Sequence, residues 1–318
     1  MSRTEEVKSL SGIITSRVRS VSYTHLPMRK YLQKQDIKNW MGEIMESLVK
    51  IESRSHRYKE KYLSPQKQEE VVSQFWAAKN RAVLLDYDGT LVEFSTNPLQ
   101  ATADTALHAL LDRLVALPNT LLFVVSGRDR GFLSENIGNN AIGLVAEHGT
   151  FIRSPGQTEW KTIDWRGTDW FAKILPIMAR YESRIYGSFI EKKESSLVFH
   201  YRGALGEPEL VRERINELFD DLVYFTSNID MQVIRGSSLL EVRNQGATKG
   251  TAALSIISLP IHDFILAIGD DTTDEDLFKV LPGSACTVRV GYGESAARFY
   301  VNDIPECKRL LENLCRLR

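Results

Sequence analysis

The sequence predicts an α/β fold: a parallel β-sheet core with an inserted α+β domain, preceded by a helical N-terminal extension. In residues 78–154 and 238–318, short apolar runs alternate with helical stretches, which is typical of a parallel sheet covered on both faces. In residues 155–237, helical stretches instead flank paired strand-like runs across a Gly-Ser turn. We therefore expect this middle segment to form a small domain of its own.

Residues 1–77 are highly charged and show two helical patterns without visible chemistry. The first pattern has four apolar residues on one face: Trp40, Ile44, Leu48 and Ile51. In the second, "SPQKQEEVVSQFW", Ser64 can cap a helix that Pro65 begins. We expect both stretches to be helical.

The core elements follow in a regular order. In the first half the expected strands are "AVLLDYD", "TLLFVVSG" and "IGLVAEHG", with helices from about 103 to 115 and near "DRGFLSEN". In the second half a helix follows "ATKG", and then come the strand "FILAIGDD", a helix at "DEDLFKV", the strand "ACTVRVG" and a helix in "PECKRLLENLCRL". The inserted domain has helices at "WFAKILPIMARYES" and "EPELVRERINELFDD", and strands within "GSFIEKKESSLVFHYR", "MQVIRG" and "SLLEVR".

Composition excludes several classes of protein. The chain has 318 residues, 43% of them hydrophobic, which is enough to bury a sizeable core in about two domains. No apolar run approaches the roughly 20 residues of a membrane helix, and the first 20 residues lack a signal peptide's apolar centre, so we expect no membrane contact and a cytoplasmic location. A net charge of −1 argues against a nucleic-acid partner. Cys286, Cys307 and Cys315 lack metal-ligand spacing and should be reduced thiols.

Two acids stand where the first core strand ends. Asp86 should lie at the carboxyl end of the sheet, and Gly89 permits a tight turn that brings Asp88 back to the same space. Such a pair suits a nucleophile that attacks phosphorus and a proton donor that serves the leaving oxygen. A cation must then offset the negative charges, and Mg²⁺ prefers oxygen ligands of this kind.

Further candidate residues follow at other strand ends. Asp270 and Asp271 come after a second strand, with Asp274 a turn further on. Ser126 offers a hydroxyl, and Lys249 offers a positive charge at an expected helix start. Each motif alone could be a capped turn, a solvated lysine or an acidic helix N-terminus. Their joint order at the strand ends favours a phosphate-binding site.

These motifs resemble those of the haloacid dehalogenase superfamily of phosphotransferases: "DYDGT", "VVSGR", Lys249 and "GDDTTDE". The resemblance covers residues from about 80 to 318 and implies a Rossmann-like core with an inserted cap. Within that superfamily, "AEHG", "GSFIEKKESSLVFHYR" and "LEVRNQGATKG" look like trehalose-6-phosphate phosphatase. The resemblance thus implies Mg²⁺-dependent hydrolysis of trehalose 6-phosphate, a sugar phosphate of trehalose biosynthesis.

The resemblance also implies a role for each catalytic residue. Asp86 would be the nucleophile and a Mg²⁺ ligand, Asp88 the general acid/base with its backbone carbonyl on the metal, and Asp270 the remaining ligand. Asp271 and Asp274 would be supporting acids. Ser126 and Lys249 would bind the transferring phosphoryl group.

Six residues would face the sugar by the same resemblance. Glu191 and Lys193 of the cap, with Glu241, would bind hydroxyl groups, and Arg128, Glu147 and His148 would line the rim between cap and core. Glu191 and Lys193 could instead be a solvated strand face, and His148 a structural histidine. Glu241 lies inside an apolar run, where a carboxylate needs partners. At Asn244 the family commonly has proline.

The stretch "LPMRKYLQKQDIKNWMGEIMESL" resembles the tail of the glycosyltransferase domain of trehalose-6-phosphate synthase. It implies that the chain is part of a bifunctional protein, with a synthase domain or subunit as partner. The alternative is an independent helical arm for assembly. For the function, two alternatives also remain: the same chemistry on another sugar phosphate such as sucrose 6-phosphate, or a regulatory module that has lost turnover.

Overall fold

The computed structural model describes Met45 and residues 59–93, 101–165, 167–236, 238–258 and 262–316. The chain divides into two compact units, Met1–Lys61 and Tyr62–Arg318, and every element below belongs to the second. The helix expected around Trp40 to Ile51 lies outside the described residues, apart from Met45. Within the described ranges, no helix is both long and apolar enough to cross a membrane.

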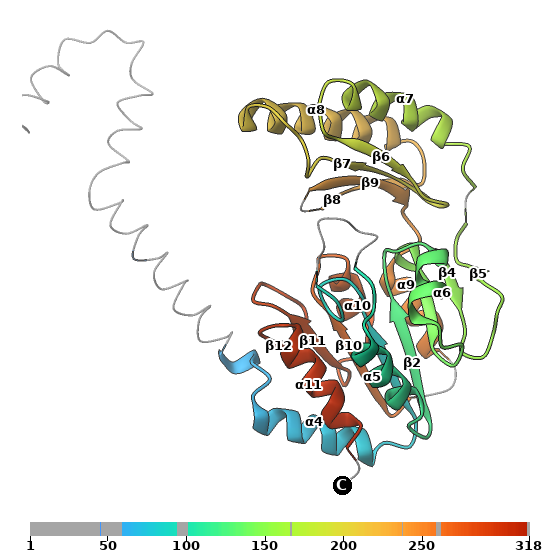
Figure 1. Ribbon diagram of the computed structural model, residues 1–318, viewed down its shortest axis with the longest axis vertical. Coiled ribbons are helices and arrows are strands. Elements are labelled where there is room, and N and C mark those ends of the chain that lie inside the picture. Colours follow the sequence, from blue (N-terminus) through green and yellow to red (C-terminus); the bar gives the residue numbers. More distant parts are fainter. Residues whose placement is uncertain are drawn as a thin grey trace, which may run out of the picture. The chain divides into compact units, whose positions relative to one another are not determined.

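An eight-stranded sheet forms the core of this unit (Figure 1). In sheet order its strands are β12 (Phe299–Val301), β11 (Cys286–Val290), β10 (Phe264–Gly269), β1 (Arg81–Leu85), β2 (Thr120–Val125), β3 (Gly143–Ala146), β4 (Phe151–Arg153) and β5 (Lys161–Thr162). The strands from β12 to β3 are parallel, which confirms the predicted core, and β4 and β5 extend it antiparallel.

Helices cover both faces of this sheet. One apolar cluster includes side chains of α4 (Pro65–Ala77), α5 (Thr105–Val115), α6 (Arg130–Ile137) and α11 (Ile304–Leu314), and the other includes side chains of α9 (Lys249–Ile257) and α10 (Asp274–Val280). Alternate residues of β1 point to opposite faces: Val83 and Leu85 lie in the first cluster, and Ala82 and Leu84 in the second. Both faces are apolar because both are covered.

Local sequence signals fix the ends of these helices. Ser64 accepts a hydrogen bond from the backbone N–H of Lys67, and Pro65 is the first residue of α4, as predicted. Thr248 and Thr251 form a reciprocal capping box at the start of α9. The box places Lys249 at the first position of that helix, beside the carboxyl ends of the strands.

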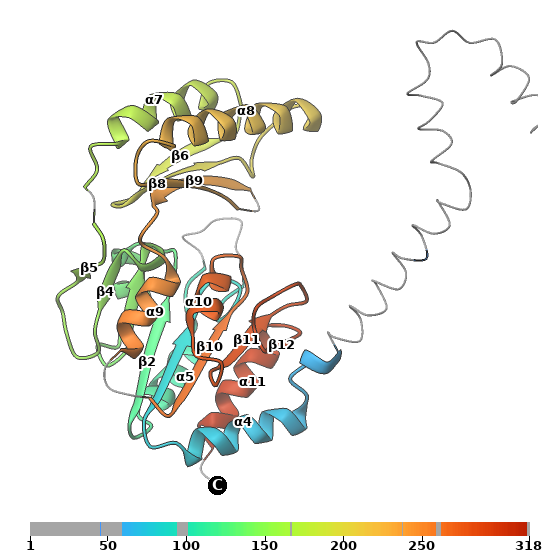
Figure 2. The same ribbon diagram turned by 180° about the vertical axis from the view of Figure 1, so that it is seen from behind.

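A four-stranded antiparallel sheet with two helices forms the inserted domain, called the cap below (Figure 2). Its strands in sheet order are β6 (Phe189–Lys192), β7 (Ser196–His200), β9 (Leu239–Asn244) and β8 (Met231–Arg235). Helices α7 (Phe171–Glu182) and α8 (Pro208–Thr226) pack on one face through a third apolar cluster. The other face carries polar side chains.

The strand pairings differ from the boundaries predicted at 77, 155 and 238. Strand β9 pairs with β7 and β8 in the cap, whereas β5 pairs with β4 in the large sheet. The α4 helix packs on the large sheet through Phe75, so it belongs with the core rather than with an extension. We therefore place the cap between β5 and the end of β9.

Asn244 ties together the two chain segments that join the cap to the core. Its side-chain amide N–H donates to the carbonyl of Asp164 in the first segment, and its carbonyl oxygen accepts from the N–H of Gly246 in the second at 3.1 Å. Asp164 has a left-handed backbone with a φ of 47°. The asparagine that departs from the family pattern thus makes contacts that a proline side chain lacks.

Candidate active site

Asp86 and Lys249 form a buried ion pair where β1 ends. Lys249 Nζ donates to Asp86 Oδ1 at 2.6 Å and to Asp274 Oδ1 at 2.8 Å. Asp86 is 4% exposed, and its backbone N–H is held by the carbonyl of Ile268 in β10. Burial alone would lower the Lys249 pKa, but the two carboxylates raise it above its ordinary value, so the ammonium stays charged.

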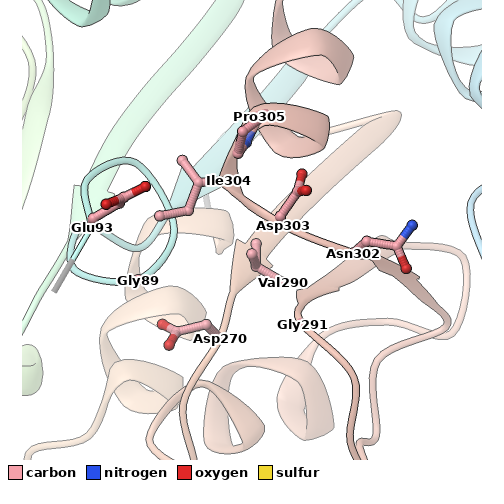
Figure 3. A pocket seen from close by; sticks show the side chains of 9 residues that line it. All are labelled: Gly89, Glu93, Asp270, Val290, Gly291, Asn302, Asp303, Ile304 and Pro305. Carbon is pink, nitrogen blue, oxygen red and sulfur yellow. The ribbon is translucent and has the colours of Figure 1, made fainter.

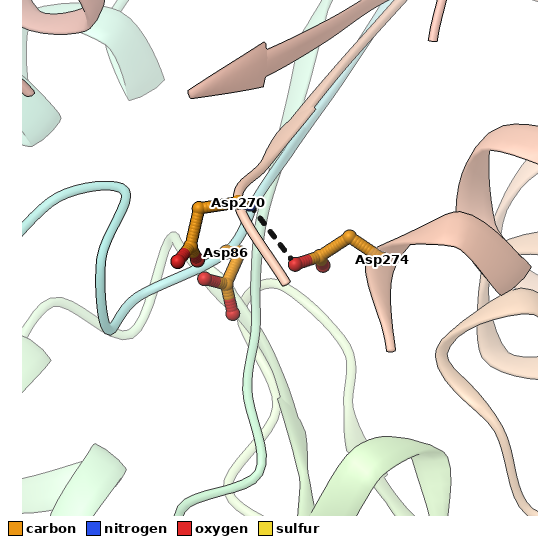
Figure 4. A group of neighbouring side chains, drawn as sticks. All are labelled: Asp86, Asp270 and Asp274. Atoms are coloured by element: carbon orange, nitrogen blue, oxygen red, sulfur yellow. Dashed lines mark hydrogen bonds between the residues drawn. The ribbon is translucent and has the colours of Figure 1, made fainter. Parts of the chain in front are cut away.

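Three aspartates converge at this point (Figure 4). Oxygen atoms of Asp86, Asp270 and Asp274 lie within 4.8 Å of one another. Burial, reinforced by the neighbouring Asp274, raises the pKa of Asp86 well above its ordinary value and that of Asp270 to about 7. A single ammonium group therefore leaves this cluster with an excess of negative charge.

The cluster fits a divalent cation. Carboxylate oxygens are the ligands that Mg²⁺ prefers, and a cation would relieve the repulsion that raises both pKa values. Asp86 and Asp270 suit direct ligation. Asp274 is fully buried, and its oxygens already accept from Lys249 and from the backbone N–H groups of Asp270 and Asp271, both at 3.1 Å. Asp274 therefore positions its neighbours.

Asp271 lies outside the aspartate cluster. It is exposed, and its Oδ1 accepts from the backbone N–H and the hydroxyl of Thr272, at 2.6 and 2.9 Å. This aspartate therefore holds the turn before α10. Of the two supporting acids, the structure brings only Asp274 to the cluster.

Gly89 lets the turn after β1 approach Asp270. Its φ is +82°, and a Cβ at this position would lie 2.3 Å from Asp270 Oδ2. A pocket of about 330 Å³ opens beside both residues and continues to the start of α11 at Asp303, Ile304 and Pro305 (Figure 3). The aspartate cluster therefore borders a cavity.

Asp88 faces an arginine. Arg128 donates to it with two parallel bonds, from Nε to Oδ2 at 2.7 Å and from Nη2 to Oδ1 at 2.5 Å. Arg128, expected at the sugar rim, thus orients the predicted acid/base. Ser126 is buried at the end of β2, and its Oγ accepts from the backbone N–H of Arg128 at 3.2 Å.

Glu147 joins the core to the cap. It follows β3 in the short 3₁₀ helix η3 (Glu147–Gly149), where both it and His148 have a left-handed backbone. Its Oε2 accepts from the backbone N–H of Ser195 at 2.7 Å and also from the Ser195 hydroxyl, and its Oε1 accepts from the N–H of Glu194 at 3.3 Å. The cap turn therefore donates hydrogen bonds to the carboxylate that was expected to face the sugar.

Glu241 and His148 meet between cap and core. Glu241 is 4% exposed, accepts from the Ser196 hydroxyl at 2.8 Å, and lies 3.3 Å from His148 Nε2. Burial lowers the His148 pKa to about 4, so the ring is neutral. Burial opposes ionisation of Glu241, but His148, Lys193 and Arg243 hold its pKa well below its ordinary value.

The other two predicted cap residues are also held by partners. Glu191 Oε2 lies 2.7 Å from His200 Nε2, and Lys193 Nζ donates to the carbonyl of Gly127 at 3.0 Å. Lys193 thus bridges the cap to the loop that follows β2. Neither residue is simply a solvated part of a strand face.

Two residues near the site were missing from the sequence prediction. Ser195 binds Glu147 and carries no sequence signal, because serines are common in turns. Arg243 lies on the same cap face as Glu241, two residues further along β9. Strand alternation could have revealed it, since residues two apart share a face.

The sequence matches the family model described as trehalose-phosphatase over residues 84–301. The chain is 39% identical over 289 residues to a bifunctional trehalose-6-phosphate synthase/phosphatase of Thermoproteus tenax, an alignment that covers 90% of this chain and 39% of that protein. It is 30% identical over 280 residues to a trehalose-phosphatase of Saccharomyces cerevisiae, covering 81% of this chain and 31% of the other. The chain thus spans well under half the length of these relatives.

The fold is similar to that of solved phosphatases. The C-terminal domain of C. albicans trehalose-6-phosphate phosphatase superposes with a TM-score of 0.72 at 29% identity, covering 78% of this chain and 96% of that one. A trehalose-6-phosphate phosphatase of Aspergillus fumigatus gives 0.60 at 29% identity, covering 78% and 97%. With the family model matching more than half of its residues, the chain belongs to the trehalose-phosphatase family.

Proposed function

We propose that this chain hydrolyses trehalose 6-phosphate to trehalose and phosphate through an aspartyl-phosphate on Asp86. The observation that carries the proposal is the buried Asp86, paired with Lys249 at 2.6 Å and set among further carboxylates at the ends of the strands. Family membership supports the phosphatase chemistry and the sugar.

In the first step, an Asp86 oxygen attacks phosphorus while the bond from phosphorus to the sugar oxygen breaks. Asp88 gives its proton to that oxygen, and trehalose leaves. Lys249 and Ser126 bind the phosphoryl oxygens. Mg²⁺ held by Asp86, Asp270 and the backbone carbonyl of Asp88 would supply the positive charge that lets one anion approach another.

In the second step, Asp88 takes a proton from water, whose oxygen attacks the same phosphorus. The bond from phosphorus to Asp86 breaks, phosphate leaves, and both carboxyl groups return to their starting state. Asp88 must leave its paired geometry with Arg128 during this cycle. We therefore assign Arg128 the role of positioning Asp88 between the steps.

The cap supplies the contacts to the sugar in this proposal. Glu191 and Glu241 can accept from hydroxyl groups, and Lys193 can donate to hydroxyl oxygens. All three already hold partners of the cap or the core in this structure. Cap closure over the substrate would exclude bulk water from the aspartyl-phosphate.

Phosphate release from trehalose 6-phosphate, sucrose 6-phosphate and glucose 6-phosphate, each with Mg²⁺ and again with EDTA, tests the proposal. We expect metal-dependent release that strongly favours trehalose 6-phosphate. Equal release from all three would remove the substrate assignment. A folded protein that binds the sugar phosphate and releases none would favour the regulatory alternative.

A synthase domain or subunit remains the partner that we propose, because the T. tenax relative is named a synthase/phosphatase and this chain covers only 39% of it. A cytoplasmic location stays a prediction. Synthase activity that co-purifies with this protein would support the partnership.

A further inference from the structure

Two side chains of the cap carry buried hydrogen-bond donors that the reaction described above leaves unused. Arg243 in β9 is 3% exposed, and its Nε and Nη1 atoms have no hydrogen-bond partner among the described residues. Gln232 is its register partner in β8, and its Nε2 is likewise buried and unpaired within the described ranges. Unpaired buried donors are costly, so a ligand that accepts from them is a natural explanation.

Both side chains belong to the polar face of the cap. Leu240 and Val242, which flank Glu241, pack in the apolar cluster with α7 and α8, so Glu241 and Arg243 point the other way. Met231 and Val233 place Gln232 on that same polar face. This face meets the core at η3, because Glu241 lies 3.3 Å from His148 Nε2.

His148 adds an acceptor to these donors. Burial keeps its ring neutral, with a pKa of about 4, and the Nε2 atom faces Glu241. The proton therefore belongs on Nε2, which leaves Nδ1 as an acceptor, and Nδ1 is also buried without a partner in the described part of the chain.

Donors and acceptors together favour a polyhydroxy ligand over an anion. A phosphate would use the donors of Arg243 but would be repelled by the carboxylate of Glu241 and the lone pair of His148 Nδ1. A hydroxyl group both donates and accepts, so it can satisfy all of these atoms. The mixed set is therefore suited to neighbouring hydroxyl groups of a sugar.

Arg243 acts on the residues that meet between cap and core. Its positive charge lowers the pKa of Glu241 and of His148, and the charge of Lys249 also acts on His148. Arg243 thus belongs to the group of residues between cap and core.

We propose that Arg243, assisted by Gln232, binds hydroxyl oxygens of the substrate's sugar and so determines which sugar phosphate is accepted. The proposal rests on the function proposed above and adds two residues to its sugar site. Arg243 should contribute more to sugar binding than Gln232, since its Nε and Nη1 atoms both lack a partner among the described residues and its donors are charged.

The test compares Arg243→Met and Gln232→Met with a control on the same hairpin, Arg235→Met. Arg235 is exposed, donates to Asn216 at 2.9 Å and lies over the Phe219 ring of α8, on the opposite face of the sheet. Methionine keeps the approximate length of glutamine and the apolar stem of arginine, and it removes the N–H groups. For each variant kcat and KM are measured on trehalose 6-phosphate and on p-nitrophenyl phosphate, together with the melting temperature.

We expect Arg243→Met to lower kcat/KM on trehalose 6-phosphate by about 10- to 100-fold, with most of the change in KM, and to affect the aryl phosphate far less. Gln232→Met should show a smaller loss of the same kind, and Arg243→Lys should recover part of it. Arg235→Met should change neither substrate. The melting temperature of Arg243→Met should stay within a few degrees, since Nε and Nη1 have no hydrogen-bond partner among the described residues to lose.

Parallel losses on both substrates, or a large fall in melting temperature, would show that Arg243 only holds the cap against Asp271 and Asp276, and would overturn the proposal. Unchanged kinetics on trehalose 6-phosphate would overturn it as well. A wild-type protein that fails to hydrolyse trehalose 6-phosphate would refute the proposed function together with this extension. If the wild type hydrolyses trehalose 6-phosphate but the variants lose activity equally on both substrates, only the role proposed for Arg243 and Gln232 would be refuted.

Discussion

At Asp86 the folded environment and the proposed reaction favour opposite protonation states. Burial and the charge of Asp274 raise its pKa, yet a nucleophile must be ionised at neutral pH. Lys249, 2.6 Å away, favours the ionised form, and a divalent cation would favour it further. The residue is thus costly to the free protein and useful for phosphoryl transfer, a common trade-off at active sites.

Asp86→Asn should abolish turnover, because an amide is a very poor nucleophile. The metal-free protein should melt at the same temperature or higher, since the change removes one of three crowded carboxylates. Steady-state phosphate assays and calorimetry without metal measure the two effects. Measurable phosphate release by this variant would refute the nucleophile assignment.

Arg128→Met should lower kcat on trehalose 6-phosphate and on a small aryl phosphate in parallel. Its guanidinium holds Asp88 with two hydrogen bonds, and Asp88 serves both substrates. The control is Arg130→Met, because Arg130 is paired with the exposed Glu194. A loss confined to the sugar phosphate would instead restore the sugar-rim role that the sequence predicted for Arg128.

At the scale of elements, η3 joins the sheet edge to the cap through an unusual backbone. Glu147 and His148 have φ values of 46° and 56°, a region that non-glycine residues seldom adopt. Gly149 follows at +119°, where a Cβ would lie 2.3 Å from the carbonyl oxygen of Thr248. The turn therefore brings Glu147 to the cap while passing close to the start of α9.

Glu147→Gln should lower the free energy of unfolding by about 1–3 kcal/mol, because an amide cannot accept from all three donors of Ser195 and Glu194. Urea unfolding measures this change. Glu194→Gln is the matched control, since that exposed residue pairs with Arg130 and should contribute less than about 1 kcal/mol. Unchanged stability with a selective loss of trehalose 6-phosphate binding would contradict the cap-joining role.

The sequence could predict most long elements, because their apolar periods and caps are local. Helix α10 lies at the expected "DEDLFKV", and α4 begins at Pro65. Strands β4, β5 and β12 were missed, since two or three residues are too few to show a period. The strand "SLLEVR" was expected beside "MQVIRG" in the inserted domain, but the predicted boundary at 238 separated β9 from the cap. The pairing of β9 with β7 that joins it to the cap depends on contacts that are distant in sequence.

The candidate site was predictable to the extent that strand ends in a parallel sheet gather at one edge. That rule brings Asp86 and Asp270 together, and Lys249 reaches them from the start of α9. It does not say where a flexible side chain points, so the pairing of Asp88 with Arg128 was not foreseen. The hydrogen bonds from Ser195 and Glu194 of the cap to the Glu147 carboxylate also depend on tertiary contacts that no local pattern shows.

For the whole molecule, the aspartate cluster should make stability depend on pH and on metal together. Asp270 has a pKa raised to about 7, so the folded state holds its proton more tightly than the unfolded chain does. The contribution of Asp270 to the free energy of unfolding is complete at pH values below the ordinary pKa of an aspartate. It is lost as the pH rises to about 7, the pKa of Asp270 in the folded state. A divalent cation replaces that proton and should restore what is lost.

Mg²⁺ should therefore raise the melting temperature more at about pH 7.5 than at about pH 5, where protons compete with it. Calorimetry with and without Mg²⁺ at both pH values measures the difference. Asp270→Asn should remove most of the Mg²⁺ effect. An equal gain in melting temperature at both pH values would contradict the coupling between metal and proton.

The central claim is that Asp86 carries the phosphoryl group, and trapping that intermediate tests it most directly. Asp88→Asn removes both the acid of the first step and the base that activates water, so the substrate is p-nitrophenyl phosphate, whose leaving group needs no proton. The intermediate should then accumulate when this variant meets that substrate and Mg²⁺. Rapid acid quenching and mass spectrometry of the peptide that contains both residues should find one phosphoryl group, located on Asp86. Turnover by the wild type without any phosphorylated peptide in the variant, or a phosphoryl group on another residue, would contradict the account.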